Sequence, residues 1–223
     1  MLKKPFLIIT VTICALLSGC QTNEPTVVAN GKISNPSMGF NGYEAKLPPG
    51  YIEYNHEKMG DNHKMGSVVH TIQENNTIRG AHYGDQVIVV SPDFAILFSV
   101  SEVYLPTKYR RLNDIGNVST SSVKFAHLQD RDKQLFLSNW VNGAKSSGNI
   151  VEREVIDLSD TPAKNLYVGR VVMEYPSIHL VIVDYYVLGK STEMFVISGA
   201  GSLYKLDEIS SDIEYMAKNL DVK

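Results

Sequence analysis

Two stretches of the chain carry apolar residues at helical spacing. In residues 206–220 the apolar positions form one stripe, and charged residues such as Glu208 and Lys218 lie outside it. A shorter stripe lies in residues 137–144, before Gly148. Apolar residues that recur at i, i+3, i+4 and i+7 predict an amphipathic helix that covers another layer. The stripes consist of Leu206, Ile209, Ile213, Met216, Ala217 and Leu220, and of Leu137, Trp140, Val141 and Ala144.

Shorter apolar runs before and between these helices predict β-strands. The segment 94–104 is apolar on both faces, which is typical of a central strand. The Pro176-Ser177 and Gly189-Lys190-Ser191 turns are too short for a crossover, so the strands that they join must be antiparallel. The predicted fold class is α+β, with an antiparallel β-sheet covered by helices. The expected strands are 40–47, 68–72, 87–90, 94–104, 150–158, 166–175, 178–188 and 193–198.

The first twenty residues have the charge and hydrophobicity profile of an export signal. Lys3 and Lys4 precede an uncharged apolar run over residues 5–17, which is shorter than the ~20 residues that a membrane-spanning helix needs. Leu17-Ser18-Gly19-Cys20 then matches the lipobox of bacterial lipoproteins. By that resemblance, diacylglycerol is attached to the sulfur of Cys20 and the signal is cleaved before it. The alternative is a cysteine that follows an apolar leader by chance.

These features divide the chain into a signal peptide (1–19), a lipidated tether (20–38) and a single α+β domain (39–223). The tether is expected because its residues are mainly Asn, Thr, Ser, Pro, Gly and Ala, which bury little apolar surface. Gln21 is not the aspartate that retains enteric lipoproteins at the inner membrane, so the resemblance favours the outer membrane, facing the periplasm. In a Gram-positive cell, the anchor would be the plasma membrane.

Composition excludes several classes of function. Cys14 leaves with the signal and Cys20 is blocked by lipid, so the domain has no free thiol for a cysteine protease, a redox centre or a thiolate metal site. Without Lys3 and Lys4, the 21 basic residues fall to 19 against 24 acidic ones, a formal balance of −5. No basic run is present, so nucleic acid is not an expected partner. The expected partners are the lipid bilayer, through acylated Cys20, and an envelope protein whose identity the sequence does not reveal.

The order of elements resembles the Mog1/PsbP-like α/β/α domain over residues 39–220. The long polar segment 55–84 departs from the compact members of that family. The resemblance implies a binding or assembly module, because the members share no catalytic residues and include photosystem assembly subunits, a nuclear-transport factor and bacterial lipoproteins of unassigned role. The residues that carry the resemblance are Gly39-Phe40, Leu47-Pro48-Pro49-Gly50-Tyr51, Asp160-Thr161-Pro162-Ala163, Tyr185-Tyr186-Val187 and Gly189.

A polar segment rich in histidine and methionine is the candidate metal site. Imidazole and thioether groups together suit copper. However, the histidines are seven, seven and twelve residues apart, whereas a helical pair would be four apart. The competing interpretation is a polar loop in which histidine is merely soluble. The candidate ligands are His56, Met59, His63, Met65, His70 and His82.

The remaining motifs have ordinary explanations. Gly199-Ala200-Gly201-Ser202 suggests a phosphate-binding turn before a helix, but it lacks the third glycine of a dinucleotide loop. Asp130 and Asp132 alternate with basic residues, which favours a solvated face. Trp140 and the tyrosines could line a groove, although such aromatics are usually core. We therefore expect a non-enzymatic envelope module without a cofactor. The alternatives are a copper-binding protein and a hydrolase without a recognisable motif.

Overall fold

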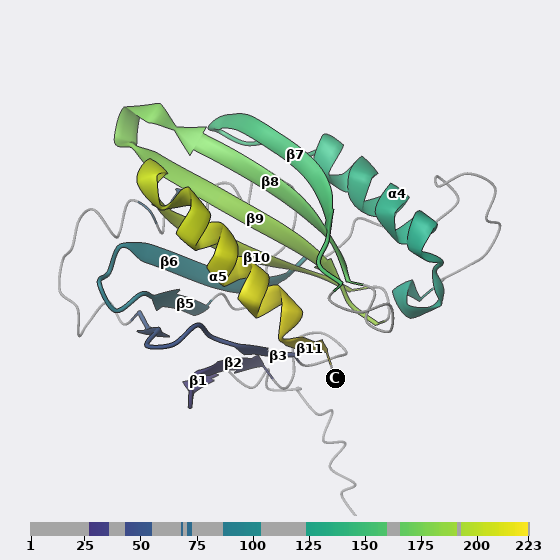
Figure 1. Cartoon of the computed structure of the whole chain (residues 1–223), viewed down its shortest axis with the longest axis horizontal. Coiled ribbons are helices and arrows are strands. Elements are labelled where there is room, and N and C mark those ends of the chain that lie inside the picture. Colours follow the sequence, from purple (N-terminus) through teal and green to yellow (C-terminus); the bar gives the residue numbers. More distant parts are fainter. Residues whose placement is uncertain are drawn as a thin grey trace, which may run out of the picture.

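The structure, a computed structural model, describes residues 27–35, 43–54, 68, 71–72, 87–103, 124–159, 166–190 and 193–222. These residues form two antiparallel sheets and two main helices (Figure 1). The larger sheet has seven strands in the order β4-β5-β6-β10-β9-β8-β7, so β6, β10 and β9 are central. Its strands are β4 (Ile52–Glu53), β5 (Val87–Val90), β6 (Ile96–Val103), β7 (Asn149–Asp157), β8 (Tyr167–Tyr175), β9 (Leu180–Leu188) and β10 (Met194–Ser202).

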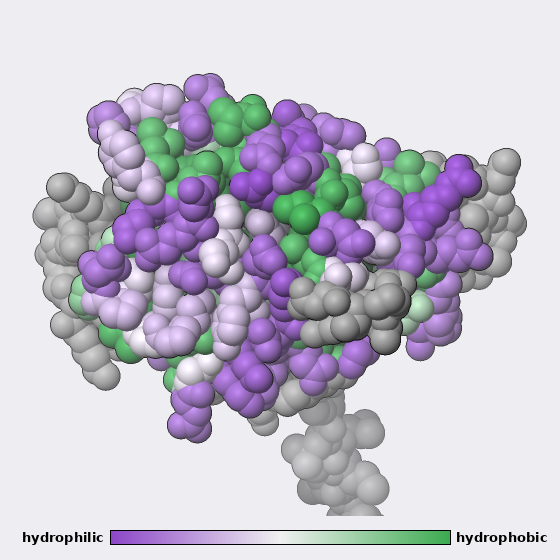
Figure 2. Space-filling model, in the orientation of Figure 1, coloured by the Kyte–Doolittle hydropathy of each residue, from purple (hydrophilic) through white to green (hydrophobic). Residues whose placement is uncertain are grey.

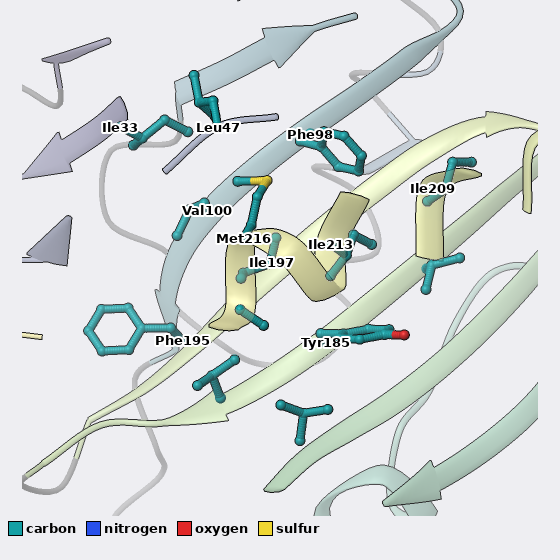
Figure 3. Packing of buried hydrophobic residues seen from close by; sticks show 14 of the residues in the cluster. Ile33, Leu47, Phe98, Val100, Tyr185, Phe195, Ile197, Ile209, Ile213 and Met216 are labelled. Carbon is teal, nitrogen blue, oxygen red and sulfur yellow. The ribbon is translucent and has the colours of Figure 1, made fainter. Parts of the chain in front are cut away.

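Helix α5 (Leu206–Lys218) covers one face of the large sheet. Its Ile209, Ile213 and Met216 are fully buried against side chains of β6, β9 and β10 (Figure 3). A Cβ atom on Gly199 of β10 would lie 2.7 Å from Cγ2 of Ile209 and closer still to the Phe98 ring, so only glycine allows this approach. Residues 199–202 end a strand that packs under α5, which agrees with the ordinary explanation preferred for the Gly199-Ala200-Gly201-Ser202 motif.

Helix α4 (Asp130–Asn142) covers the opposite face, over β7 and β8. Leu137 and Val141 are buried there, and Val141 occupies the space that a side chain on Gly169 would need. β9 places Val183 and Tyr185 on the α5 side and Ile182 on the α4 side. Side chains alternate along a strand, so both faces of the sheet are core. The predicted α+β class, an antiparallel sheet covered by helices, is confirmed.

A smaller sheet, in the order β1-β2-β3-β11, packs beside α5 and extends the same core. Asn30 and Gly31 join its first two strands with φ angles of 51° and 70°, as a tight hairpin turn requires. Ile33 in this hairpin has no exposed surface, so residues 27–35 belong to the folded part and not to the expected tether. The strands are β1 (Val27–Ala29), β2 (Lys32–Asn35), β3 (Tyr43–Lys46) and β11 (Leu220–Val222).

Two other expectations differ from the structure. Val68, Thr71 and Ile72 are helical, whereas we predicted a strand over 68–72. A short apolar run does not distinguish a strand from a buried helical turn, and Ile72 is 1% exposed. Leu220 belongs to β11 and not to the last helix. In the described part of the chain, no helix is long and apolar enough to cross a membrane.

Candidate functional site

The site residues predicted from the sequence cannot be located in the fold. All of them lie outside the described residues, so the lipid anchor and the copper loop stay predictions. Within the described ranges, no group of three or more His, Cys, Asp or Glu side chains is placed to hold a metal ion. The residues concerned are Cys20, His56, Met59, His63, Met65, His70 and His82.

Three large apolar side chains are exposed at one end of the large sheet. Phe94 is 46% exposed, Ile178 is 52% exposed and Tyr204 is 97% exposed. Phe94 precedes β6, Ile178 precedes β9 and Tyr204 follows β10. The strand register pairs the start of β6 and the start of β9 with the end of β10, so the three residues share one end of the sheet. We call this surface the aromatic end.

Phe94 has a left-handed backbone with φ of 56°. This conformation costs a bulky residue ~1–3 kcal/mol and persists only where the surroundings impose it. Here they do: the Phe94 N–H donates to the Ser91 carbonyl oxygen at 2.9 Å, and the Ile96 N–H donates to Ser91 Oγ at 3.0 Å. The same turn exposes the ring at about half of its surface. His179, beside Ile178, also has a positive φ of 52°. Backbone strain therefore coincides with the exposed apolar residues.

Charged side chains surround the aromatic end. Lys205 Nζ lies 3.5 Å from Oδ2 of Asp93 and 2.6 Å from Oε2 of Glu208. The Ser91 hydroxyl and the Ala95 N–H both donate to Asp93, and these hydrogen bonds lower the pKa of its carboxyl. Asp93 is therefore charged at neutral pH. An apolar patch with a charged rim is the usual composition of a protein-binding surface.

Tyr51 and Asp212 form a second polar contact beneath this end. The Tyr51 hydroxyl donates to Oδ2 of Asp212 at 2.7 Å, which ties the loop after β3 to α5. The sequence pattern placed Asp212 outside the helical stripe, but burial raises the pKa of its carboxyl above the ordinary value. Burial also raises the pKa of the Tyr51 hydroxyl, so the tyrosine remains a neutral donor. This contact stabilises the fold and offers no nucleophile.

A shallow groove of about 450 Å³ lies between α5 and β8. Arg170 of β8 reaches into it and donates to Glu152, to Oε1 of Glu154 at 2.8 Å, and to Oγ of Ser210 at 3.3 Å. Burial raises the pKa of Glu152, while hydrogen bonds from Glu152 and Arg170 lower the pKa of Glu154. Pairs of carboxyl groups whose pKa values are shifted in opposite directions occur in acid–base catalytic sites. Both carboxylates here are more than a third exposed and paired with Arg170, which fits a structural ion cluster on the edge strand β7.

The α4 face of the large sheet contains a row of buried polar side chains. Ser99, Ser198 and Asp184 are each 1% exposed and lie side by side across β6, β10 and β9. The Tyr186 hydroxyl donates to Oδ2 of Asp184 at 3.3 Å. Within the described residues, Oγ of Ser198 has no hydrogen-bond partner. A buried hydroxyl without a partner costs ~1–3 kcal/mol, so Ser198 lowers the stability of the fold.

The aromatic side chains do not form the groove that the sequence suggested. Tyr185 and Tyr186 are 2% and 0% exposed, and the Trp140 ring meets the Tyr186 ring edge-on at 5.9 Å. They belong to the two cores. Asp130 pairs with Lys133 at 3.5 Å in the first turn of α4, which agrees with the solvated face expected there.

Comparisons with known proteins show likeness to solved structures. No family model matches the chain, and no curated protein matches it. The chain is similar to cyanobacterial PsbP (CyanoP) from Synechocystis sp. PCC 6803, whose solution structure gives a TM-score of 0.43 and 14% sequence identity. The match covers 91% of this chain and 99% of that chain. PsbP belongs to the family that the order of elements resembles.

Proposed function

We propose that this protein is a lipid-anchored, non-enzymatic binding module of the bacterial cell envelope, which docks a partner protein on its aromatic end. The anchor rests on the lipobox at Cys20, and the outer membrane facing the periplasm is the favoured location. The observation that carries the docking proposal is Phe94, an aromatic residue held in a left-handed conformation with its ring exposed.

Phe94 strains the backbone of its turn and leaves about half of its surface exposed to solvent. A glycine or asparagine would fill the turn without strain, and a polar side chain would suit the solvent. Phe94 is instead exposed beside a tyrosine that is 97% exposed. Aromatic residues are the commonest anchors of protein interfaces, because they bury a large area at little cost in conformational entropy. The occupant that fits is a protein surface with an apolar pocket and groups that complement Asp93 and Lys205.

Capture from detergent-solubilised envelopes tests the docking. The lipidated protein should retain a specific partner, and Phe94→Ser combined with Tyr204→Ser should lose it. Leu135→Ser combined with Val151→Ser is the control, because these two residues are also exposed apolar side chains but lie on α4 and β7. Equal retention by both double variants would remove the aromatic end as the docking surface.

Palmitate labelling in cells tests the anchor independently. The unmutated chain should be labelled, and Cys20→Ala should abolish labelling and leave an unprocessed or soluble species. Labelling that persists in Cys20→Ala would end the lipoprotein proposal, whatever the capture experiment shows.

A further inference from the structure

Strand β7 forms a long edge of the large sheet. It spans nine residues, Asn149–Asp157, and β8 is its only neighbour among the described strands. The strand at the opposite edge, β4, has only two residues. Figure 2 shows hydrophobic and hydrophilic residues interspersed along the upper edge of the molecule, where β7 lies in Figure 1. An edge of this length offers unpaired backbone groups to another strand, so it needs either protection or a partner.

The backbone groups of alternate β7 residues point away from the sheet. The Leu158 N–H donates to the Leu166 carbonyl oxygen at 2.8 Å, which continues the β7–β8 register by one pair. Inward-facing and outward-facing residues alternate along an antiparallel edge strand, so the N–H and C=O groups of Arg153, Val155 and Asp157 face outward. Within the described part of the chain, no backbone hydrogen bond outside the β7–β8 ladder involves these three residues. They can therefore pair with one more antiparallel strand.

The features that usually protect an edge strand are confined to one end of β7. A β-bulge lies between Ile150 and Glu152, and the register from Glu152 to Asp157 is regular. None of the nine residues is a proline. Arg153 and Asp157 are exposed, share one face of the strand, and lie on either side of Val155. Two opposite charges about an apolar centre are complementary to an antiparallel copy of the same segment.

The charges select one register for such a pairing. If a two-fold axis perpendicular to the sheet passes through Val155, Arg153 of each copy lies opposite Asp157 of the other. All three outward-facing residues then exchange both of their backbone hydrogen bonds with the second copy. An axis through Glu152, Arg153, Glu154 or Asp157 would instead place like charges directly opposite one another, which is destabilising. The sequence of the edge therefore favours the register centred on Val155.

We infer that two copies of this chain pair through β7 in an antiparallel dimer, which continues the large sheet across a two-fold axis at Val155. The glutamates on the α5 face are compatible with this pairing, because Glu152 and Glu154 form ion pairs with Arg170 of their own chain. The axis keeps both copies of α4 on the same face of the continued sheet. This surface is separate from the aromatic end, so the inference does not rest on the proposed function.

Sedimentation equilibrium of the full chain tests the dimer, at low salt and with detergent micelles in excess. The unmutated chain should sediment as a dimer at micromolar concentration. Arg153→Glu alone and Asp157→Arg alone each place like charges opposite one another twice, so each should weaken dimerisation roughly tenfold or more. An equimolar mixture of the two variants places opposite charges together again and should form a heterodimer with about the affinity of the unmutated chain.

Matched charge reversals away from β7 are the control. Lys46→Glu on β3 and Glu53→Arg on β4 change exposed residues by the same charge and should leave dimerisation unchanged. A monomeric unmutated chain would overturn the inference, as would a dimer that neither reversal on β7 weakens. Two monomeric variants that do not combine on mixing would exclude the register centred on Val155. Palmitate labelling and partner capture report the proposed function separately, so the two failures are distinguishable.

Discussion

Replacing Phe94 with glycine separates the effect of this residue on stability from its proposed role in partner binding. Glycine adopts the left-handed conformation freely, which recovers ~1–2 kcal/mol of strain. About half of the ring is buried, so removing it forfeits ~1–1.5 kcal/mol of the burial energy of a phenylalanine. The greater freedom of glycine in the unfolded chain costs ~0.5–1 kcal/mol more. The net change in the free energy of unfolding should lie between about −1.5 and +0.5 kcal/mol.

Phe98→Ala is the matched control, because Phe98 lies in the strand that follows and is fully buried. Its loss should destabilise the fold by ~3–5 kcal/mol. For a domain of this size, each kcal/mol corresponds to about 2–4 °C in Tm. The Tm values of the two variants should therefore differ by at least about 3 °C. Phe94→Gly should nevertheless abolish partner capture. A fall in Tm as large as that of Phe98→Ala would show that Phe94 is a structural residue, and the strain argument would be refuted.

Four further outcomes are expected. Ile213→Asp places a charge in the core beneath α5 and should lower stability by several kcal/mol, so an unchanged Tm would contradict the docking of this helix. Because the pKa of Asp212 is raised in the folded state, its contribution to stability is present below about pH 4 and is lost as pH rises. Asp212→Asn should accordingly raise Tm at neutral pH and have no effect in acid, and the opposite pH dependence would contradict the assigned shift. Ser198→Ala removes a buried hydroxyl without a described partner and should raise stability by about 1 kcal/mol, whereas a loss above 1 kcal/mol would reveal a hydrogen bond. Calorimetry with Cu(I) and Cu(II) should show no binding tighter than about micromolar, and tight binding lost on joint replacement of His56, His63 and His70 would establish the copper alternative.

Most of the large sheet and both helices could be predicted, because the spacing of apolar residues in a long segment indicates which of its faces is buried. The stripe of Ile209, Ile213 and Met216 predicted α5, and the apolar segment around Phe98 predicted the central strand β6. The β1–β2 hairpin was missed although Asn30-Gly31 between alternating residues is a strong turn signal. Polar composition outweighed that signal, and two short strands are stable only when a third strand and a core complete them.

The sequence by itself predicted the export signal and the lipobox, and it determined the alternation that makes an antiparallel α+β sandwich. Those features depend on local order along the chain, where periodicity and turn residues act directly. Only the tertiary structure decided which apolar residues remain exposed on the surface. The sequence predicted that Phe94 lies in a strand, and no sequence pattern marked Tyr204. The register of β6, β9 and β10 nevertheless brings both residues to one end of the sheet. The packing of α5 on the sheet likewise brings Lys218 near Lys190 at the other end. Exposure and charge at a surface depend on which distant segments meet there, and no local pattern encodes that meeting.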